Sequence, residues 1–390
     1  MKTMRATLLL ILALNAPAPF VAAFQQGGDV IRTQAPPEVE RDEQRRVRVK
    51  LAPGMKVAVD NVTTGRIVVE GWDRDYVEAV ATSERGNEHV RAKTAPGPDG
   101  QFVVALTADY LTPPWPSLPS LWGVLSGRPR PTPSPTPSPA PQPTPTPSPE
   151  PLLPQKYFPA PEEVHLHVKL PRNIELDLIE VNRSEVEVTG VTTPVRVNGR
   201  RSAVKLRDVG AVEARTQGGP VEVDGAAGLV DVVTSGGHIN IRDVRGDVRA
   251  LSLSGRIELR CVRGRVNAGS TEGAIVLSGI EGDADAMTVN SDVKFDGPVR
   301  AEGRYHLKSM SGSVEMGLRR NPPGFTALLS SYRGPVESDF ELGPRQQPKG
   351  ANGTRLTGRH GDGRAQITLD SFDGLVKLSR LSQDSSEGCK

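Results

Sequence analysis

Two short stretches decide the fold: Ile239–Val248 reads INIRDVRGDV, and Ile257–Val266 reads IELRCVRGRV. Both follow the pattern I-x-[I/L]-R-x-V-R-G-x-V, and they are offset by eighteen residues. Related strand-like segments recur at nearly this spacing on both sides. They start at Val186, Val204, Val221, Ile239, Ile257, Ile275 and Val293, and then drift to Val314 and Val336. A repeat of this length indicates stacked coils, because a single unit cannot bury its apolar face alone.

Within one repeat, Ile239 and Ile241 alternate with polar residues, which predicts a strand with one inward face. Val244, in the turn that follows, is expected to point inward. Gly246 is expected to supply the unusual backbone angles of a corner, and a second short strand begins at Val248. The equivalent glycines are Gly228, Gly264 and Gly282. Two strands and two corners per coil predict an all-β, single-stranded β-helix or β-solenoid with coils of about 18 residues.

The second turn of each repeat carries a hydroxyl side chain. These residues are Thr234, Ser252, Ser270 and Thr288. Stacked at the spacing of neighbouring strands, about 4.8 Å, they are expected to form a structural ladder.

The N-terminus has the pattern of a secretory signal peptide. Lys2 and Arg5 precede the apolar run Thr7–Leu14, and small residues stand before a cleavage point that precedes Phe24. The apolar run is shorter than the roughly 20 residues that span a bilayer, so cleavage is predicted rather than anchoring. The predicted location is therefore outside the cytoplasm: the periplasm, the cell surface or the medium.

The chain contains two cysteines, Cys261 and Cys389. An exported protein can join such a pair in a disulfide. The two lie far apart in sequence, and Cys389 belongs to a polar tail, so two unpaired thiols are the alternative.

Proline occupies every second position from Pro129 to Pro151, which predicts an extended polyproline II spacer that joins no sheet. Before it, Trp115–Trp122 is expected to cover one end of the β-structure or to dock on a partner.

The predicted organisation is a signal peptide (1–23), a disordered N-terminal segment (24–46), a first β-strand portion of the solenoid (47–110), a disordered Pro-rich linker insertion (111–160), the β-solenoid repeats (161–345), a flexible loop (346–358), final strands (359–381) and a disordered tail (382–390).

Three segments carry a resemblance to a known family: Gly65–Thr82, Val164–Val191 and the V-x-V repeats. Together they resemble the bacterial adhesin-like family of β-strand repeats, a domain of unknown function in exported proteins. The resemblance covers about Val47 to Leu381. Asn182-Arg183-Ser184 departs from it, because a tight Asn-Gly turn is expected there. The resemblance implies a β-helical fold and an envelope or surface location, and it transfers no catalytic residue.

No catalytic or metal site is predicted, although three patterns have spacings that occur in such sites. Ser202 with Lys205 and Ser291 with Lys294 match Ser-x-x-K, but they fall across strand starts, whereas that chemistry needs a helix. Asp283 and Asp285 have a spacing that could suit a glycosidase, and His165 with His167 could hold a metal. The former is interpreted as a solvated face and the latter as surface histidines, so neither an enzyme nor a cofactor is predicted.

The arginines are the remaining candidate site. The repeat places Arg242 beside Arg260 and Arg245 beside Arg263 on neighbouring coils. Like charges at this distance repel, so stability does not explain them, and their guanidinium forks suit a carboxylate or phosphate ligand. The alternative is that nearby acids neutralise them. The 48 basic and 46 acidic residues nearly cancel, so no nucleic-acid partner is predicted.

The predicted function is a non-enzymatic, exported β-solenoid that interacts, like an adhesin, with an envelope or surface glycan, another anionic polymer or an envelope protein. The alternatives are a carbohydrate-active enzyme on a β-helix scaffold and a scaffold for an envelope protein complex. The enzyme would need a groove that combines acids with aromatic side chains, and none is evident in the sequence.

Overall fold

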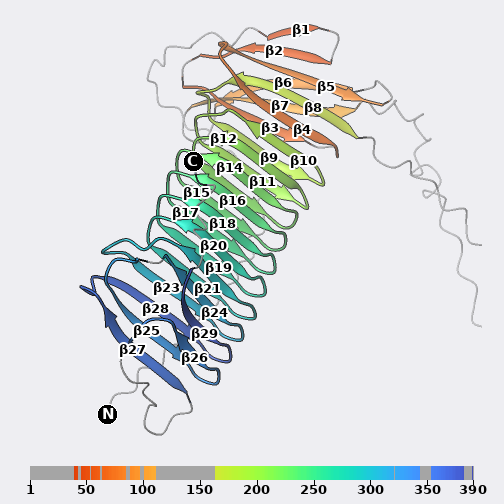
Figure 1. Ribbon diagram of the computed structural model, residues 1–390. Coiled ribbons are helices and arrows are strands. Elements are labelled where there is room, and N and C mark those ends of the chain that lie inside the picture. The colour runs from red at the N-terminus through yellow and green to blue at the C-terminus, as the bar shows by residue number, and fades with distance from the viewer. Residues whose placement is uncertain are drawn as a thin grey trace, which may run out of the picture. The chain divides into compact units, whose positions relative to one another are not determined.

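The computed structural model describes residues 39–42, 45–52, 54–61, 64–84, 88–96, 101–110, 163–319, 321–342, 353–381 and 389. The described part of the chain is all-β and contains no helix, and its strands form two large sheets of 15 and 14 strands (Figure 1). Most neighbouring strands are parallel, and each coil contributes one strand to each sheet. The predicted β-solenoid fold is confirmed.

The first sheet contains, in spatial order, β1 (Val39–Asp42), β2 (Arg46–Lys50), β5 (Tyr76–Ser83), β8 (Val164–Pro171), β4 (Arg66–Trp72), β10 (Glu185–Thr189), β12 (Ala203–Val209), β14 (Val221–Ala226), β16 (Ile239–Val244), β18 (Ile257–Val262), β20 (Ile275–Ile280), β22 (Val293–Gly297), β24 (Val314–Leu318), β29 (Val376–Arg380) and β26 (Val336–Ser338).

The second sheet contains, in spatial order, β27 (Thr354–His360), β25 (Phe325–Ser331), β28 (Ala365–Ser371), β23 (Arg304–Ser309), β21 (Ala284–Thr288), β19 (Val266–Ser270), β17 (Val248–Ser252), β15 (Val230–Thr234), β13 (Val212–Thr216), β11 (Val195–Arg200), β9 (Leu176–Asn182), β3 (Lys56–Asn61), β7 (Phe102–Tyr110) and β6 (Glu88–Pro96).

The central coils keep the register that the repeat predicts. Ile239 pairs with Ile257, and Ile257 pairs with Ile275, in consecutive parallel strands. Ile241 and Leu259 are fully buried between the two sheets. The alternation of apolar and polar residues therefore builds one continuous core along the stack, with the polar residues on the outer faces.

The first corner, which follows each strand of the first sheet, is built differently from the prediction. Val244 is buried as expected, but Gly246 and Gly264 do not have positive φ. A Cβ on either would collide with the backbone of the glycine one coil before. The left-handed residues stand three positions earlier: Gly225 (φ 82°), Asp243 (φ 56°), Cys261 (φ 55°) and Gly279 (φ 63°). The repeated glycines are thus required for close packing of coils.

The second corner, which follows each strand of the second sheet, contains the buried hydroxyls. Thr216 Oγ1 donates a 2.9 Å hydrogen bond to Thr234 Oγ1 on the next coil, and Thr234 Oγ1 in turn donates to Gly236 O at 3.0 Å. Ser252 and Ser270 instead each accept a 2.8 Å hydrogen bond from a glycine amide in their own turn. Thr234, Ser252 and Ser270 stack in register as predicted, and their hydroxyls mainly satisfy the backbone of their own turns.

The two ends depart from simple stacking. Antiparallel pairs occur at both: β1 with β2 and β6 with β7 at one end, and β25 with β27 at the other. The coil of β3 and β4 lies between those of β7–β8 and β9–β10. Likewise, the last coil in sequence, β28–β29, lies between β23–β24 and β25–β26. Each end closes by inserting a coil out of chain order.

Two predicted boundaries change for this reason. Strand β1 lies within the segment 24–46 that was expected to be disordered, because it pairs with the otherwise exposed edge of β2. Strand β27 begins at Thr354, inside the expected flexible loop 346–358, because it covers the edge of β25. The final strands do lie within 359–381 as β28 and β29.

Several predicted segments lie outside the described residues: the signal peptide 1–23, the Pro-rich run with Trp115–Trp122, and most of the tail. The strands that flank the Pro-rich segment, β7 and β8, both stack on the coil of β3 and β4. At the equivalent place one coil on, β9 and β10 are joined by Arg183 and Ser184 alone. Arg183 makes that tight turn itself with φ 52°.

The cysteines form a disulfide, Cys261–Cys389, with an S–S distance of 2.01 Å. Leu381 follows β29 and donates a 2.7 Å backbone hydrogen bond to Leu318. Cys389 lies against Gly279, beside Cys261. The two cysteines are therefore paired and are not free thiols. The bond holds Cys389 at the first corner of β18, which lies four strands from β29 in the first sheet.

Candidate ligand-binding site

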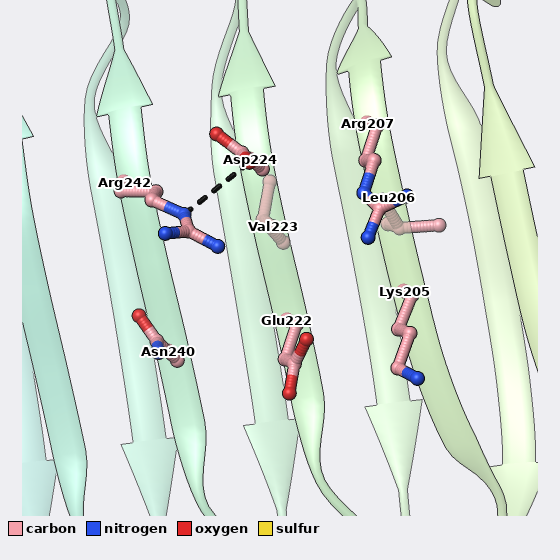
Figure 2. Close-up of a pocket in the computed structure, with 8 residues that line it drawn as sticks. All are labelled: Lys205, Leu206, Arg207, Glu222, Val223, Asp224, Asn240 and Arg242. Atoms are coloured by element: carbon pink, nitrogen blue, oxygen red, sulfur yellow. Dashed lines mark ion pairs between the residues drawn. The ribbon is translucent and has the colours of Figure 1, made fainter.

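The structure divides the four predicted arginines into two pairs. Arg242 and Arg260 are register partners on the outer face of the first sheet. Arg242 Nε lies 3.3 Å from Asp224 Oδ2, the ion pair drawn in Figure 2. Arg260 Nε donates to Glu258 Oε1 at 2.7 Å. Acids on the same face thus neutralise this pair, as the alternative interpretation expected.

The outer face around Arg242 offers no room for a ligand. Figure 2 shows its side chains in parallel rows on neighbouring strands, with Glu222 between Asn240 and Lys205. The hollow among them has a volume of about 10 Å³. This is about the space of one water molecule, so the charged side chains of this face are exposed to solvent and do not enclose a ligand site.

Arg245 and Arg263 occupy the first corner instead. Arg263 donates its backbone N–H to Val244 O at 2.9 Å, so the two arginines stand one coil apart. Both line a groove of about 510 Å³ that runs along the first corners of β10 to β18. We call it the corner groove. The structure thus brings this predicted pair together in a concave site, whereas Arg242 and Arg260 lie outside it.

The corner groove has mixed charge. Asp208, Asp224 and Asp243 contribute carboxylates to its wall, together with the two guanidinium groups. Cys261 lies at its end, where the disulfide holds Cys389. With three carboxylates and two guanidinium groups, the lining has a formal charge of −1. It offers both hydrogen-bond acceptors and donors, which suits a ligand rich in hydroxyl groups whose acidic groups meet the two arginines.

A second hollow, of about 520 Å³, lies near the N-terminal end of the stack. Its lining includes Trp72, Asp73, Arg74, Asp75 and Arg172. The sequence contained a signal for it: the segment that carries the family resemblance continues as Trp72–Tyr76. Its partners across the hollow lie about a hundred residues away, so the sequence alone did not connect them. We call it the Trp72 hollow.

The residues of the Ser-x-x-K and histidine patterns make structural contacts. Ser202 is buried, with Oγ 3.1 Å from Val181 O, and Lys205 Nζ binds Glu185 at 2.9 Å. His167 faces Glu70 at 3.4 Å. In these contacts Ser202 and Lys205 do not face each other as Ser-x-x-K chemistry requires, and His167 is paired with a carboxylate.

Asp283 and Asp285 do not converge on a shared site either. Burial alone would raise the pKa of Asp283, but hydrogen bonds from the Arg304 amide and the Arg300 guanidinium outweigh it and lower that pKa. The Arg300 contact is 2.8 Å long, and Asp285 instead faces His306 at 3.2 Å. A lowered pKa suits an ion-pair anchor rather than a general acid.

Among the described residues, no group of three or more His, Cys, Asp or Glu side chains is placed to hold a metal ion. The same part of the chain includes no helix that is long and apolar enough to span a membrane.

Comparison with known proteins adds little. No protein-family model matches the chain, and no curated protein matches it. One solved structure that matches is described as a "putative cell adhesion protein" from Clostridium sporogenes ATCC 15579. It is 8% identical in sequence with a TM-score of 0.18, and the match covers 88% of this chain and 100% of the other. Similarity this low supports no argument about function.

Proposed function

We propose that this protein is a non-enzymatic, exported solenoid that binds a polymer of the cell envelope or cell surface, as an adhesin does. The corner groove is the observation that carries the proposal. Arg245 and Arg263 lie in it one coil apart, so their guanidinium groups can bind acidic groups of a linear ligand while the carboxylates of the groove accept hydrogen bonds from its hydroxyls. An extended stack of similar coils suits a polymer with a repeating chemical structure.

The test compares the two arginine pairs. Changing Arg245 and Arg263 to Ser should abolish salt-sensitive retention of the full chain on an immobilised acidic polysaccharide. Changing Arg242 and Arg260 to Ser removes the same charge from the flat face and should leave retention nearly unchanged. Equal loss in both variants, or none in either, contradicts a role for the corner groove.

A carbohydrate-active enzyme remains the second candidate, because the Trp72 hollow combines acids with an aromatic ring. The side chains of Asp73 and Asp75 are 86% and 75% exposed. A general acid needs a shielded carboxyl with a raised pKa, so the hollow favours binding over hydrolysis. Release of reducing ends from a bound polysaccharide would overturn this choice.

Export is tested separately. Cell fractionation should recover the mature chain outside the cytoplasm, with its N-terminus at Phe24. Full retention in the cytoplasm would remove the envelope polymer as the ligand.

A further inference from the structure

The Trp72 hollow is a concave site formed by three loops. Leu51 and Ala52 follow β2, Trp72–Asp75 joins β4 to β5, and Pro171–Ile174 joins β8 to β9. Its volume of about 520 Å³ is within the range of sites for small ligands.

The indole of Trp72 is held in place before any ligand binds. Its Nε1–H donates to Tyr76 O at 3.0 Å, and the Tyr76 ring packs edge-on with a centroid distance of 4.8 Å. The Arg74 guanidinium lies 5.0 Å from the indole centroid. A rigid, half-exposed ring that lines a hollow offers apolar surface at little entropic cost.

Polar groups surround this ring on both sides. Arg172 Nε donates to Asp73 Oδ1 at 3.0 Å, and Asn173 and Asp75 also line the hollow. The two carboxylates and the guanidinium groups of Arg74 and Arg172 balance in charge. An organic cation is disfavoured, because the Arg74 guanidinium already places a positive charge 5.0 Å from the indole centroid and would repel it.

We propose that the Trp72 hollow is a subsite for a neutral pyranose ring. The apolar face of such a sugar would pack on the part of the indole that Arg74 and Tyr76 leave exposed, and its hydroxyls would bind the carboxylates, guanidinium and amide around the rim. This inference rests on the proposed function and deepens it. It adds a second subsite for the same polymer and identifies that polymer as a glycan.

The two hollows are connected through Arg172. Its carbonyl oxygen accepts hydrogen bonds from Thr192 N at 2.8 Å and from Thr192 Oγ1 at 2.9 Å. Thr192 lines the corner groove, and Arg172 lines the Trp72 hollow. Between β4 and β18 the first sheet has five strand steps, roughly 24 Å at about 4.8 Å each. A linear glycan of several residues can therefore occupy both hollows along one row of corners.

The experiment measures binding of the full chain to neutral gluco-, manno- and galacto-oligosaccharides of increasing length. Trp72→Ala should weaken binding of the tightest series by about ten-fold, a loss of about 1.4 kcal/mol. Trp72→Phe should bind with intermediate affinity. Phe372→Ala removes another exposed aromatic ring away from the hollow and should have no effect. Affinity should rise with oligosaccharide length until both hollows are spanned.

Two controls keep the outcome decisive. Because Trp72 also supports its turn, Asn173→Ala provides a variant at the rim, and it should weaken binding several-fold. Neutral oligosaccharides that bind equally well to Trp72→Ala and Asn173→Ala, or that do not bind the unaltered chain, overturn this inference. Retention on acidic polysaccharide through Arg245 and Arg263 would then still stand, whereas loss of both kinds of binding removes the proposed function as well.

Discussion

The central coils and the two ends of the stack solve the same packing problem differently. From β14 to β20, each coil repeats the previous one after eighteen residues and pairs in parallel register. At the ends, antiparallel strands cover the last edges, and one coil is inserted out of chain order. The difference shows that repetition alone builds a core but cannot finish one, because a terminal coil has a neighbour on one side only.

The disulfide is the strongest link between the two regions, because it joins Cys261 in a central coil to the segment after the last strand. It closes a loop of 128 residues in sequence. Cys261→Ser should lower the free energy of unfolding by about 4 to 5 kcal/mol, since the unfolded chain gains entropy. Chemical denaturation measures the change. Cys389→Ser serves as the matched variant, and a clearly different loss from the two changes would contradict the bond.

Removing core volume should cost more in the centre than at the end. Ile241→Ala leaves a cavity between two complete coils and should cost about 3 to 4 kcal/mol. Leu356→Ala, on edge strand β27, should cost about 2 kcal/mol or less, because an edge strand can relax into the space. Hydrogen exchange of the backbone amides should show global loss of protection for the first variant and local loss for the second. A larger loss of stability from Leu356→Ala than from Ile241→Ala would show instead that the end of the stack limits the stability of the whole protein.

The close packing of central coils can be tested at a single glycine. Gly264→Ala places a Cβ against the backbone of Gly246 and should cost about 1 to 3 kcal/mol. Gly236→Ala is the control, since its Cβ would meet the Ser254 hydroxyl at 3.4 Å, an ordinary contact. It should change stability by less than about 0.5 kcal/mol. Thermal unfolding with equal losses at both sites would disprove the close-packing role.

The smallest expected effect lies where the regular spacing ends. Asp283 accepts hydrogen bonds from the Arg300 guanidinium, in the segment that precedes β23, and from the backbone amide of Arg304, the first residue of β23. Its pKa is lowered in the folded state, so its contribution to stability is present above about pH 4 and is lost as the pH falls through the lowered value. Asp283→Asn should cost less than about 1 kcal/mol at neutral pH, with no difference from the unaltered chain at low pH. A constant difference across pH would exclude the ion pair as its cause.

The spacing of Ile239, Ile257 and Ile275 was sufficient to predict the central coils, because each apolar face must meet an identical neighbour. The same pattern could not predict that β29 lies between β24 and β26. Parallel strands with alternating valines fit one another in any order, so the sequence pattern does not specify which coils are adjacent. The Cys261–Cys389 pair was missed as a firm prediction for the same reason, since it depends on where the last coil is placed.

The candidate site was predicted in part. The repeat identified Arg245 and Arg263 as neighbours, but only the corner geometry separates them from Arg242 and Arg260. The Trp72 hollow could not be predicted, because Arg172 and Asn173, which also line it, are separated from Trp72 in sequence by the Pro-rich segment. Local periodicity contains no information about contacts across such an insertion.

The out-of-order coils also constrain how the chain can fold as it is synthesised. The central coils can add one by one as residues become available. The slot beside β24 can be filled only after the residues of β29 exist, and β3–β4 gains its second neighbour only once β8–β10 have been made. The two ends therefore reach their final partners later than their position in the stack suggests. Until then the protein is a growing stack with open edges, the state in which pairing with another chain is the greatest hazard.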